Sequence, residues 1–149
     1  MTLALEVDLT IPDNEALTAL ATLRRLGVDL GSLERVDLWR FEVDPRHAAV
    51  LVEAVKDVET IFNPNKHGLR VRTGAEPAPG EAWLDEPEQS ALEGSPVRIA
   101  GRPLPGVARA ERFVVWRLRD RHGGPASREV VDRALETLLL NPAFQRATR

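Results

Sequence analysis

The sequence contains no cysteine, and aromatic residues make up only 5% of it. A chain without cysteine has no disulfide framework, no thiolate nucleophile and no cysteine-ligated metal. The sequence also lacks an apolar run near the roughly 20 residues that a membrane-spanning helix requires. Its N-terminus shows no signal-peptide pattern. We therefore expect a cytoplasmic protein that has no membrane partner.

An excess of positive charge is absent as well. The formal net charge is −3 at pH 7, whereas a dedicated nucleic-acid binder needs a basic field. Hydrophobic residues at 43% and charged residues at 29% describe an ordinary globular protein. A length of 149 residues suits one domain, or two half-size units that share a core. If there are two units, we expect them to pack on each other, because a unit of roughly 70 residues would be only marginally stable alone.

One stretch of the sequence occurs twice. Residues 34–40 read Glu-Arg-Val-Asp-Leu-Trp-Arg and residues 111–117 read Glu-Arg-Phe-Val-Val-Trp-Arg, so both fit Glu-Arg-x-x-x-Trp-Arg at a distance of 77 positions. Asn63-Pro64 likewise returns, one residue late, as Asn141-Pro142. A period of this length predicts an internal duplication of two small α/β units.

The first repeat begins with a strand and a helix. Apolar residues alternate with others from Leu3 to Ile11, which predicts a strand with one buried and one polar face. Asp13 is a typical N-cap for the helix that follows, and Gly27 stands at its expected end. The side chains predicted to form the buried stripe of this helix are Leu17, Leu20 and Leu23.

A second strand is predicted over residues 33–43, and it is apolar on both faces. Asp44-Pro45 then predicts the start of a helix whose apolar stripe runs from Val50 to Phe62 and stops at Asn63-Pro64. A short strand follows, and its residues are expected to alternate. The predicted inward residues are Leu69 and Val71, and the predicted outward residues are Arg70 and Arg72. The first repeat, residues 1–73, thus reads β-α-β-α-β.

The second repeat is incomplete. Residues 74–80 form a Pro/Gly linker. Residues 81–106 predict only short strands near Trp83 and Val97, because their prolines and glycines exclude a long helix. From residue 107 the repeat is legible again, with a strand apolar on both faces and a helix. The stripe of this helix consists of Val130, Val131, Ala134, Leu135, Leu138 and Leu139. Residues 81–149 are therefore a partial second unit, eroded in its first half.

The element order and the helix endings resemble the PurS family. Leu138-Leu139-Leu140-Asn141-Pro142-Ala143 is similar to the Leu-Leu-x-Asn-Pro-Val ending of that family, and Ile61-Phe62-Asn63-Pro64 is a looser version. Trp39-Arg40 and Trp116-Arg117 stand where the family usually has Gly-Lys. The resemblance covers residues 1–73, and residues 107–149 for the second half of the unit only.

This resemblance implies a fold and a function. The fold would be α+β, with two ferredoxin-like, PurS-like units of β-α-β-α-β order and a mainly antiparallel sheet. PurS proteins are small non-catalytic subunits of phosphoribosylformylglycinamidine synthase, a glutamine-dependent ligase of purine biosynthesis. They work as dimers that bridge its synthetase and glutaminase subunits. We expect this chain to use no cofactor. A tandem chain would then hold a built-in dimer, in which the two units pair within one molecule.

The repeated residues are the candidate interface. Tryptophan and arginine are enriched among the residues that carry binding energy at protein contacts. The alternative interpretation is that each Trp belongs to the core and each Arg faces solvent. The candidate interface residues are Trp39, Arg40, Asn63, Trp116, Arg117 and Asn141.

Catalytic and metal chemistry have few candidates. The histidines His47, His67 and His122 lack the spacing of a metal-ligand pair, so we predict no metal site. Asp44 with His47, and Asp120 with His122, are the visible acid–base candidates, but Asp44 has a simpler role as a helix cap. We predict no catalytic residue. The alternative function is a free-standing, ACT-like module that binds a small effector between its two units.

Overall fold

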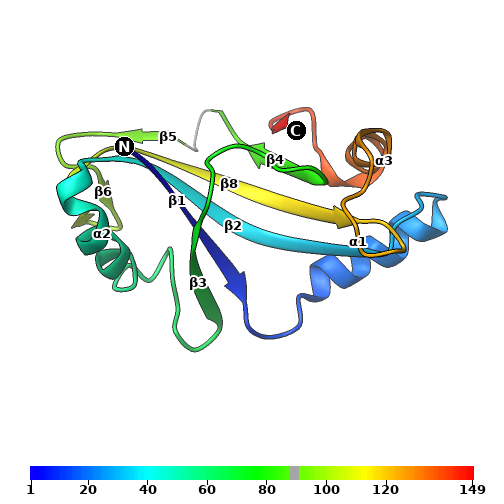
Figure 1. The fold of residues 1–149 in the computed structure, drawn as a ribbon, viewed down its shortest axis with the longest axis horizontal. Helices are drawn as coiled ribbons and strands as arrows, with labels where there is room; N and C mark the ends of the chain where they lie inside the picture. Colours follow the sequence, from blue (N-terminus) through cyan, green and yellow to red (C-terminus); the bar gives the residue numbers. More distant parts are fainter. Residues whose placement is uncertain (88–90) are drawn as a thin grey trace. The chain divides into compact units, whose positions relative to one another are not determined.

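The computed structural model describes residues 1–87 and 91–149, which form a mixture of helices and mostly antiparallel strands (Figure 1). The strands are β1 (Thr2–Leu9), β2 (Ser32–Val43), β3 (His67–Arg72), β4 (Glu81–Asp85), β5 (Ala91–Glu93), β6 (Arg98–Ile99), β7 (Arg102–Pro103), β8 (Val107–Arg119) and β9 (Arg146–Thr148). The helices are α1 (Asn14–Arg25), the 3-10 helix η1 (Pro45–His47), α2 (Ala48–Val55), α3 (Arg128–Ala134) and the π-helical turn η2 (Leu135–Leu139). None of the described helices is long and apolar enough to cross a membrane.

The strands form one sheet and one hairpin. Hydrogen-bonded neighbours follow the order β3-β1-β2-β8-β4-β9, and β5 pairs with β8 outside this path. β1 pairs antiparallel with both β2 and β3, and β4 pairs antiparallel with both β8 and β9. β6 and β7 form a separate two-stranded hairpin. The predicted α+β class with a mainly antiparallel sheet is therefore confirmed at this level.

Several predicted elements are confirmed with close boundaries. Asp13 caps α1, because its carboxylate accepts hydrogen bonds from the backbone N–H groups of Glu15 and Ala16. Gly27 follows the helix with φ of +88°, a conformation that favours glycine. Among the described residues between 81 and 106 there are short strands and no helix, as expected from the prolines and glycines.

The burial of the first strand differs from the prediction. Its predicted polar face is wrong, because Ala4 and Glu6 are buried as well as the apolar residues. The predicted alternation of β3 is wrong too: Val71 is 53% exposed, whereas the Arg72 side chain is only 9% exposed. The reason is the same for both strands. Arg72 turns toward the Glu6 carboxylate of the neighbouring strand and covers it.

The predicted helical stripes are also corrected in part. In α1 the buried residues are Ala16, Ala19 and Leu23, while Leu17 is 58% exposed. Small alanine side chains let this helix pack closely, which a count of leucines does not reveal. The second helix ends at Val55, and the chain continues to residue 62 in turns. The remaining stripe residues that prove to be exposed are Val50 and Leu138.

The chain divides into two compact units that do not coincide with the two repeats. Unit 1 contains residues 1–11, 37–75 and 88–113, and unit 2 contains residues 12–36, 76–87 and 114–149. Strands β2 and β8 each contribute residues to both units. The division into repeats at 1–73 and 81–149, joined by the linker 74–80, remains a prediction about the sequence.

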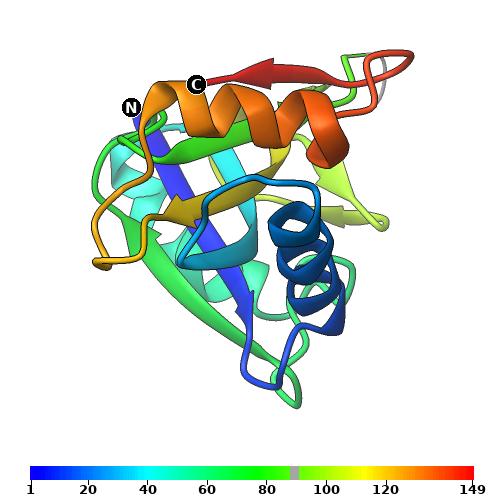
Figure 2. The same ribbon diagram turned by 90° about the vertical axis from the view of Figure 1, so that its right-hand side faces the viewer.

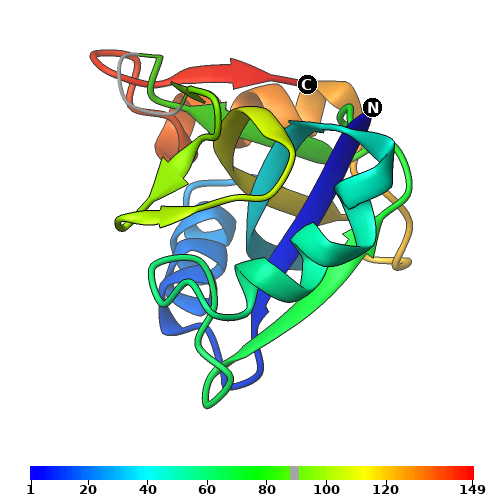
Figure 3. The ribbon, with the colours of Figure 1, turned by 90° about the vertical axis from the view of Figure 1, so that its left-hand side faces the viewer.

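Unit 1 has its core between the sheet and α2, with the segment 97–110 packed on the same cluster (Figure 3). Inward side chains of β1 and β2, such as Leu5 and Phe41, meet Leu51 and Val55 of α2. Unit 2 has its core beneath two helices, α1 and α3 with its η2 extension (Figure 2). There Ala19 and Leu23 of α1 share a cluster with Leu135, above side chains of β4 and β8.

The two units have the same strand order. In unit 1 the neighbours are β3, β1, β2 and β8, and in unit 2 they are β9, β4, β8 and β2. Each series runs from the last strand of one repeat, through its first and its long strand, to the long strand of the other repeat. Each unit also receives one segment from the other repeat. Helix α1 of the first repeat belongs to unit 2, and residues 91–106 of the second repeat belong to unit 1.

Candidate functional site

The repeated tryptophans are core residues. Trp39 lies on β2 in the unit 1 core, 7% exposed, and its ring stacks on Phe41 with centroids 6.2 Å apart. Trp116 lies on β8 in the unit 2 core and is 6% exposed. The guanidinium carbon of Arg35 stands 5.8 Å from the centre of the Trp116 ring. Their burial leaves either indole little surface for direct contact with a partner.

Arg40 holds a contact between the repeats inside unit 1. Its Nε and Nη2 donate to Oε1 of Glu111, at 3.2 and 3.1 Å, and its Nη1 donates to the carbonyl of Ala75. The guanidinium also lies over the Phe113 ring, 4.9 Å from its centre. The last residue of the motif in the first repeat, Arg40, therefore binds the first residue of the motif in the second repeat, Glu111.

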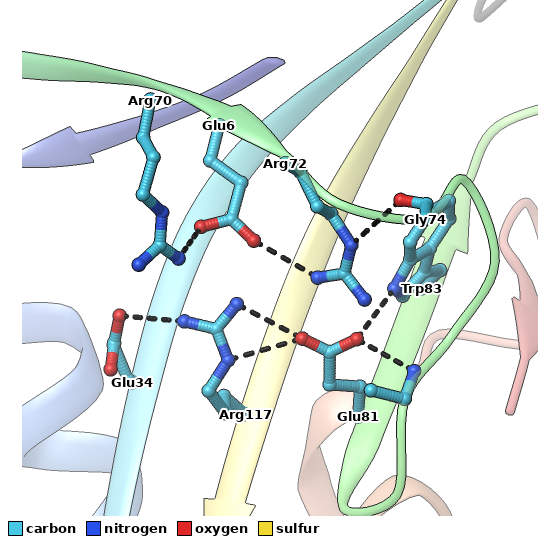
Figure 4. Close-up of polar contacts among 9 residues, drawn as sticks. Glu6, Glu34, Arg70, Arg72, Gly74, Glu81, Trp83 and Arg117 are labelled. Atoms are coloured by element: carbon cyan, nitrogen blue, oxygen red, sulfur yellow. Dashed lines mark hydrogen bonds and ion pairs between the residues drawn. The ribbon is translucent and has the colours of Figure 1, made fainter. Parts of the chain in front are cut away.

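Arg117 makes the reciprocal contact inside unit 2. Its Nη1 donates to Oε1 of Glu34 at 3.0 Å, so the motif arginine of the second repeat binds the motif glutamate of the first. Its Nε and Nη2 also donate to Oε2 of Glu81, at 3.1 and 2.9 Å (Figure 4). Reciprocal contacts of this kind are the pattern of two equal partners in a two-fold dimer. In this protein both contacts lie within one chain.

Arg35, the second residue of the motif, joins β2 to α1 within unit 2. Its Nε lies 3.2 Å from Oδ2 of the helix-capping Asp13, and its Nη1 binds Glu15. Burial alone would lower the pKa of the Arg35 guanidinium, but the hydrogen bonds and charges of these two carboxylates outweigh it and raise that pKa. In the second repeat, the corresponding Arg112 binds Asp37 at 3.2 Å in unit 1.

Asn63 builds a turn after the first repeat's second helix. Its side-chain oxygen accepts a hydrogen bond from the backbone N–H of Asn65 at 2.9 Å. Its own N–H donates to Nδ1 of His67, whose backbone N–H donates back to the Asn63 carbonyl. Asn63 is thus occupied in ordering its own loop.

Asn141 forms the same turn in unit 2. Its side-chain oxygen accepts from the N–H of Ala143 at 3.1 Å, and its N–H donates to Oε1 of Gln145 at 2.9 Å. The N–H of Gln145 donates back to the Asn141 carbonyl at 2.9 Å. Because the bonding scheme recurs with a different fifth residue, His in one turn and Gln in the other, the Asn-Pro pair specifies the turn. A partner contact of either Asn stays a prediction.

The sequence patterns do not predict the buried carboxylates on the strands. In unit 1 the Glu6 side chain, 4% exposed, binds Arg72 at 2.9 Å and also Arg70 (Figure 4). In unit 2 the Glu81 carboxylate accepts from Arg117, from Nε1 of Trp83 at 3.3 Å and from the N–H of Ala78 at 2.8 Å. Carboxylates held this fully are suited to ordering strands and linker, not to exchanging protons with a substrate.

The acid–base candidates have structural partners. Asp44 accepts hydrogen bonds from the side chain and the backbone of Arg46, which hold the pKa of its carboxyl at about 2. Its Oδ2 lies 3.8 Å from Nδ1 of His47. Asp120 accepts from the backbone N–H groups of His122 and Gly124, which closes a turn. Within residues 1–87 and 91–149, no group of three or more His, Asp or Glu side chains is placed to hold a metal ion.

Unit 2 contains a groove beside α1, which we call the α1 groove. Its volume is about 560 Å³. Trp116 lies among its lining residues together with side chains from α1 and from η2. The lining residues are Asn14, Glu15, Thr18, Ala19, Thr22, Trp116, Leu138 and Leu139.

Comparison of the chain with protein-family models and with curated proteins finds no match in either case.

Proposed function

We propose that this protein is a non-catalytic assembly subunit of the PurS kind. It would bridge a synthetase subunit and a glutaminase subunit that together form formylglycinamidine ribonucleotide. The resemblance of residues 1–73 and 107–149 to that family motivates the proposal. We further propose that the two repeats pair within one chain and take the place of a dimer, each repeat being a ferredoxin-like, PurS-like unit in ancestry.

One observation carries the proposal: the reciprocal Glu–Arg contacts of the repeated motif. Glu34 meets Arg117 in unit 2 and Glu111 meets Arg40 in unit 1. When two equal strands associate about a two-fold axis, every contact between residues i and j is accompanied by its mirror j and i. These Glu–Arg contacts support the proposed pairing of the two repeats within one chain. The equal strand order of the two units also supports this pairing of two repeats within one chain.

The test reconstitutes the three components. The synthetase and glutaminase subunits of the same organism are purified, and ligase activity is measured with glutamine or with ammonia as nitrogen donor. A bridging subunit raises the glutamine-dependent rate and leaves the ammonia-dependent rate unchanged, because only glutamine requires transfer between subunits. Co-elution of all three proteins on size exclusion accompanies it. An unchanged glutamine-dependent rate without co-elution would refute the proposal.

A further inference from the structure

The two Asn-Pro turns differ in the group that closes them. In the first turn the backbone N–H of Asn63 donates to Nδ1 of His67 at 2.9 Å. In the second turn the backbone N–H of Asn141 donates to Oε1 of Gln145, also at 2.9 Å. The acceptor is an imidazole nitrogen in unit 1 and an amide oxygen in unit 2. Of these two groups, imidazole is the one that takes up a proton between about pH 5 and about pH 8.

The hydrogen bond assigns the protonation state of His67 in the ordered turn. A ring nitrogen that accepts from an N–H group carries no proton, so Nδ1 is bare and Nε2 carries the hydrogen of the neutral imidazole. In imidazolium both ring nitrogens are donors. A proton on Nδ1 would therefore place two N–H donors against each other, and the hydrogen bond from Asn63 would be lost.

The same turn sets the start of β3. The backbone N–H of His67 donates to the Asn63 carbonyl at 2.8 Å, and the Lys66 carbonyl accepts from the N–H of Thr10 at 2.9 Å. His67 is the first residue of β3 and lies opposite Leu9 of β1. Because β3 ends the strand order of the sheet, among the described strands it pairs only with β1. An opened turn therefore loosens the start of an edge strand.

We propose that His67 makes the turn 63–67 and the start of β3 sensitive to pH. Neutral imidazole closes the turn, and imidazolium opens it. Because a proton reaches Nδ1 only after the Asn63 hydrogen bond breaks, a lower pH shifts the turn toward its open form. The turn 141–145 has an amide acceptor and keeps its order over the same pH range. This device lies in unit 1 and does not depend on the proposed bridging function.

The groups around His67 do not compensate for the lost bond. The segment 62–66 places the Phe62 ring 6.2 Å from the imidazole, centre to centre, and its charged residue is Lys66, a cation. On β1 the nearby charged residue is Asp8, whose carboxylate lies against Gly68. Successive residues of a strand face opposite sides of the sheet, so Asp8 and the imidazole lie on different faces. Among the described residues no ion pair involves His67.

Amide NMR spectra of the whole chain test the proposal. Between about pH 8 and about pH 5, the Asn63 amide should lose roughly fivefold of its protection against hydrogen exchange, the factor that corresponds to one net hydrogen bond. Protection is corrected for the intrinsic pH dependence of exchange. The Asn141 amide should keep its protection. At the higher pH, the nitrogen chemical shifts of His67 should place the ring hydrogen on Nε2.

Three matched variants assign the effect to one residue. His67→Gln copies the acceptor of the second turn and should keep the Asn63 protection at both pH values. Gln145→His is the reciprocal change and should make the Asn141 amide sensitive to pH. His122 is exposed and lies in a different turn, so His122→Gln should leave both amides as in wild type.

Three results would overturn the proposal. The first is equal Asn63 protection at both pH values in the wild-type chain. The second is a His67→Gln variant that retains the wild-type loss of protection. The third is a hydrogen on Nδ1 of His67 at the higher pH. If His67→Gln does not fold, as judged by circular dichroism, the wild-type comparison and Gln145→His decide, and a missing effect in either one rejects the proposal.

Discussion

Replacing Arg117 by methionine should destabilise the protein strongly. Methionine keeps much of the length of the side chain but removes the guanidinium that binds Glu81 and Glu34 in unit 2. The Glu81 side chain is 4% exposed and Arg117 is 13% exposed, so water cannot easily reach the carboxylate that is left behind. Removing one partner of a buried ion pair costs about 3–5 kcal/mol. That is a large part of the roughly 5–15 kcal/mol that stabilises a typical domain.

Two other arginines on the same strands calibrate this value. The Arg40 pair with Glu111 is 21% exposed on both sides, so Arg40→Met should cost less, about 1.5–3 kcal/mol. The Arg112 pair with Asp37 is 51% and 37% exposed, and Arg112→Met should cost about 0–1 kcal/mol. The order of the three losses therefore follows the burial of the three ion pairs.

Equilibrium urea unfolding, followed by far-UV circular dichroism, measures all three variants. The urea midpoint should be highest for Arg112→Met, intermediate for Arg40→Met and lowest for Arg117→Met. The slope of the unfolding free energy against urea concentration should change little. The double variant Glu81→Leu with Arg117→Met should recover part of the loss, because it leaves no unpaired charge at position 81. Equal losses for Arg117→Met and Arg112→Met would refute the reasoning.

Three further predictions concern local turns, acid stability and the repeats. Asn63→Ala and Asn141→Ala should each lower the unfolding free energy by about 0.5–1.5 kcal/mol, since each removes the side-chain acceptor of one backbone N–H; unequal effects in urea unfolding would contradict the equivalence of the two turns. The folded-state pKa of Asp44, about 2, lies below its ordinary 3.8, so its contribution to stability is present above pH 3.8 and is lost as the pH falls toward 2. Asp44→Asn should flatten the fall in melting temperature over that interval, and an unchanged pH profile would show that Asp44 does not contribute. Fragments 1–75 and 76–149 should each be largely unfolded alone and should regain the native circular dichroism spectrum when mixed, because each compact unit contains strands of both repeats; a folded isolated fragment would contradict this.

The order of residues within the repeated motif carries information about how its two copies pair. Glu and Arg stand at the two ends of a motif that occurs twice, so an antiparallel pairing of the two copies brings each Glu near the Arg of the other copy. That pairing could have been predicted from residues 34–40 and 111–117. The structure instead corrects two interpretations made from patterns of single residues. Leu17 is exposed and Glu6 is buried, because neighbours distant in sequence decide which side of each element is covered.

The sequence by itself determined the strands at residues 33–43 and after 107 and the Asp13 cap. These features depend on backbone preferences and hydrogen bonds among residues a few positions apart, which any segment carries with it. Only the tertiary structure decided that α1 lies in unit 2, that Glu6, Glu81 and Asp85 are buried, and that a groove forms beside Trp116. Each of these depends on side chains that meet across tens of residues, where burial and charge pairing, not local propensity, determine the outcome.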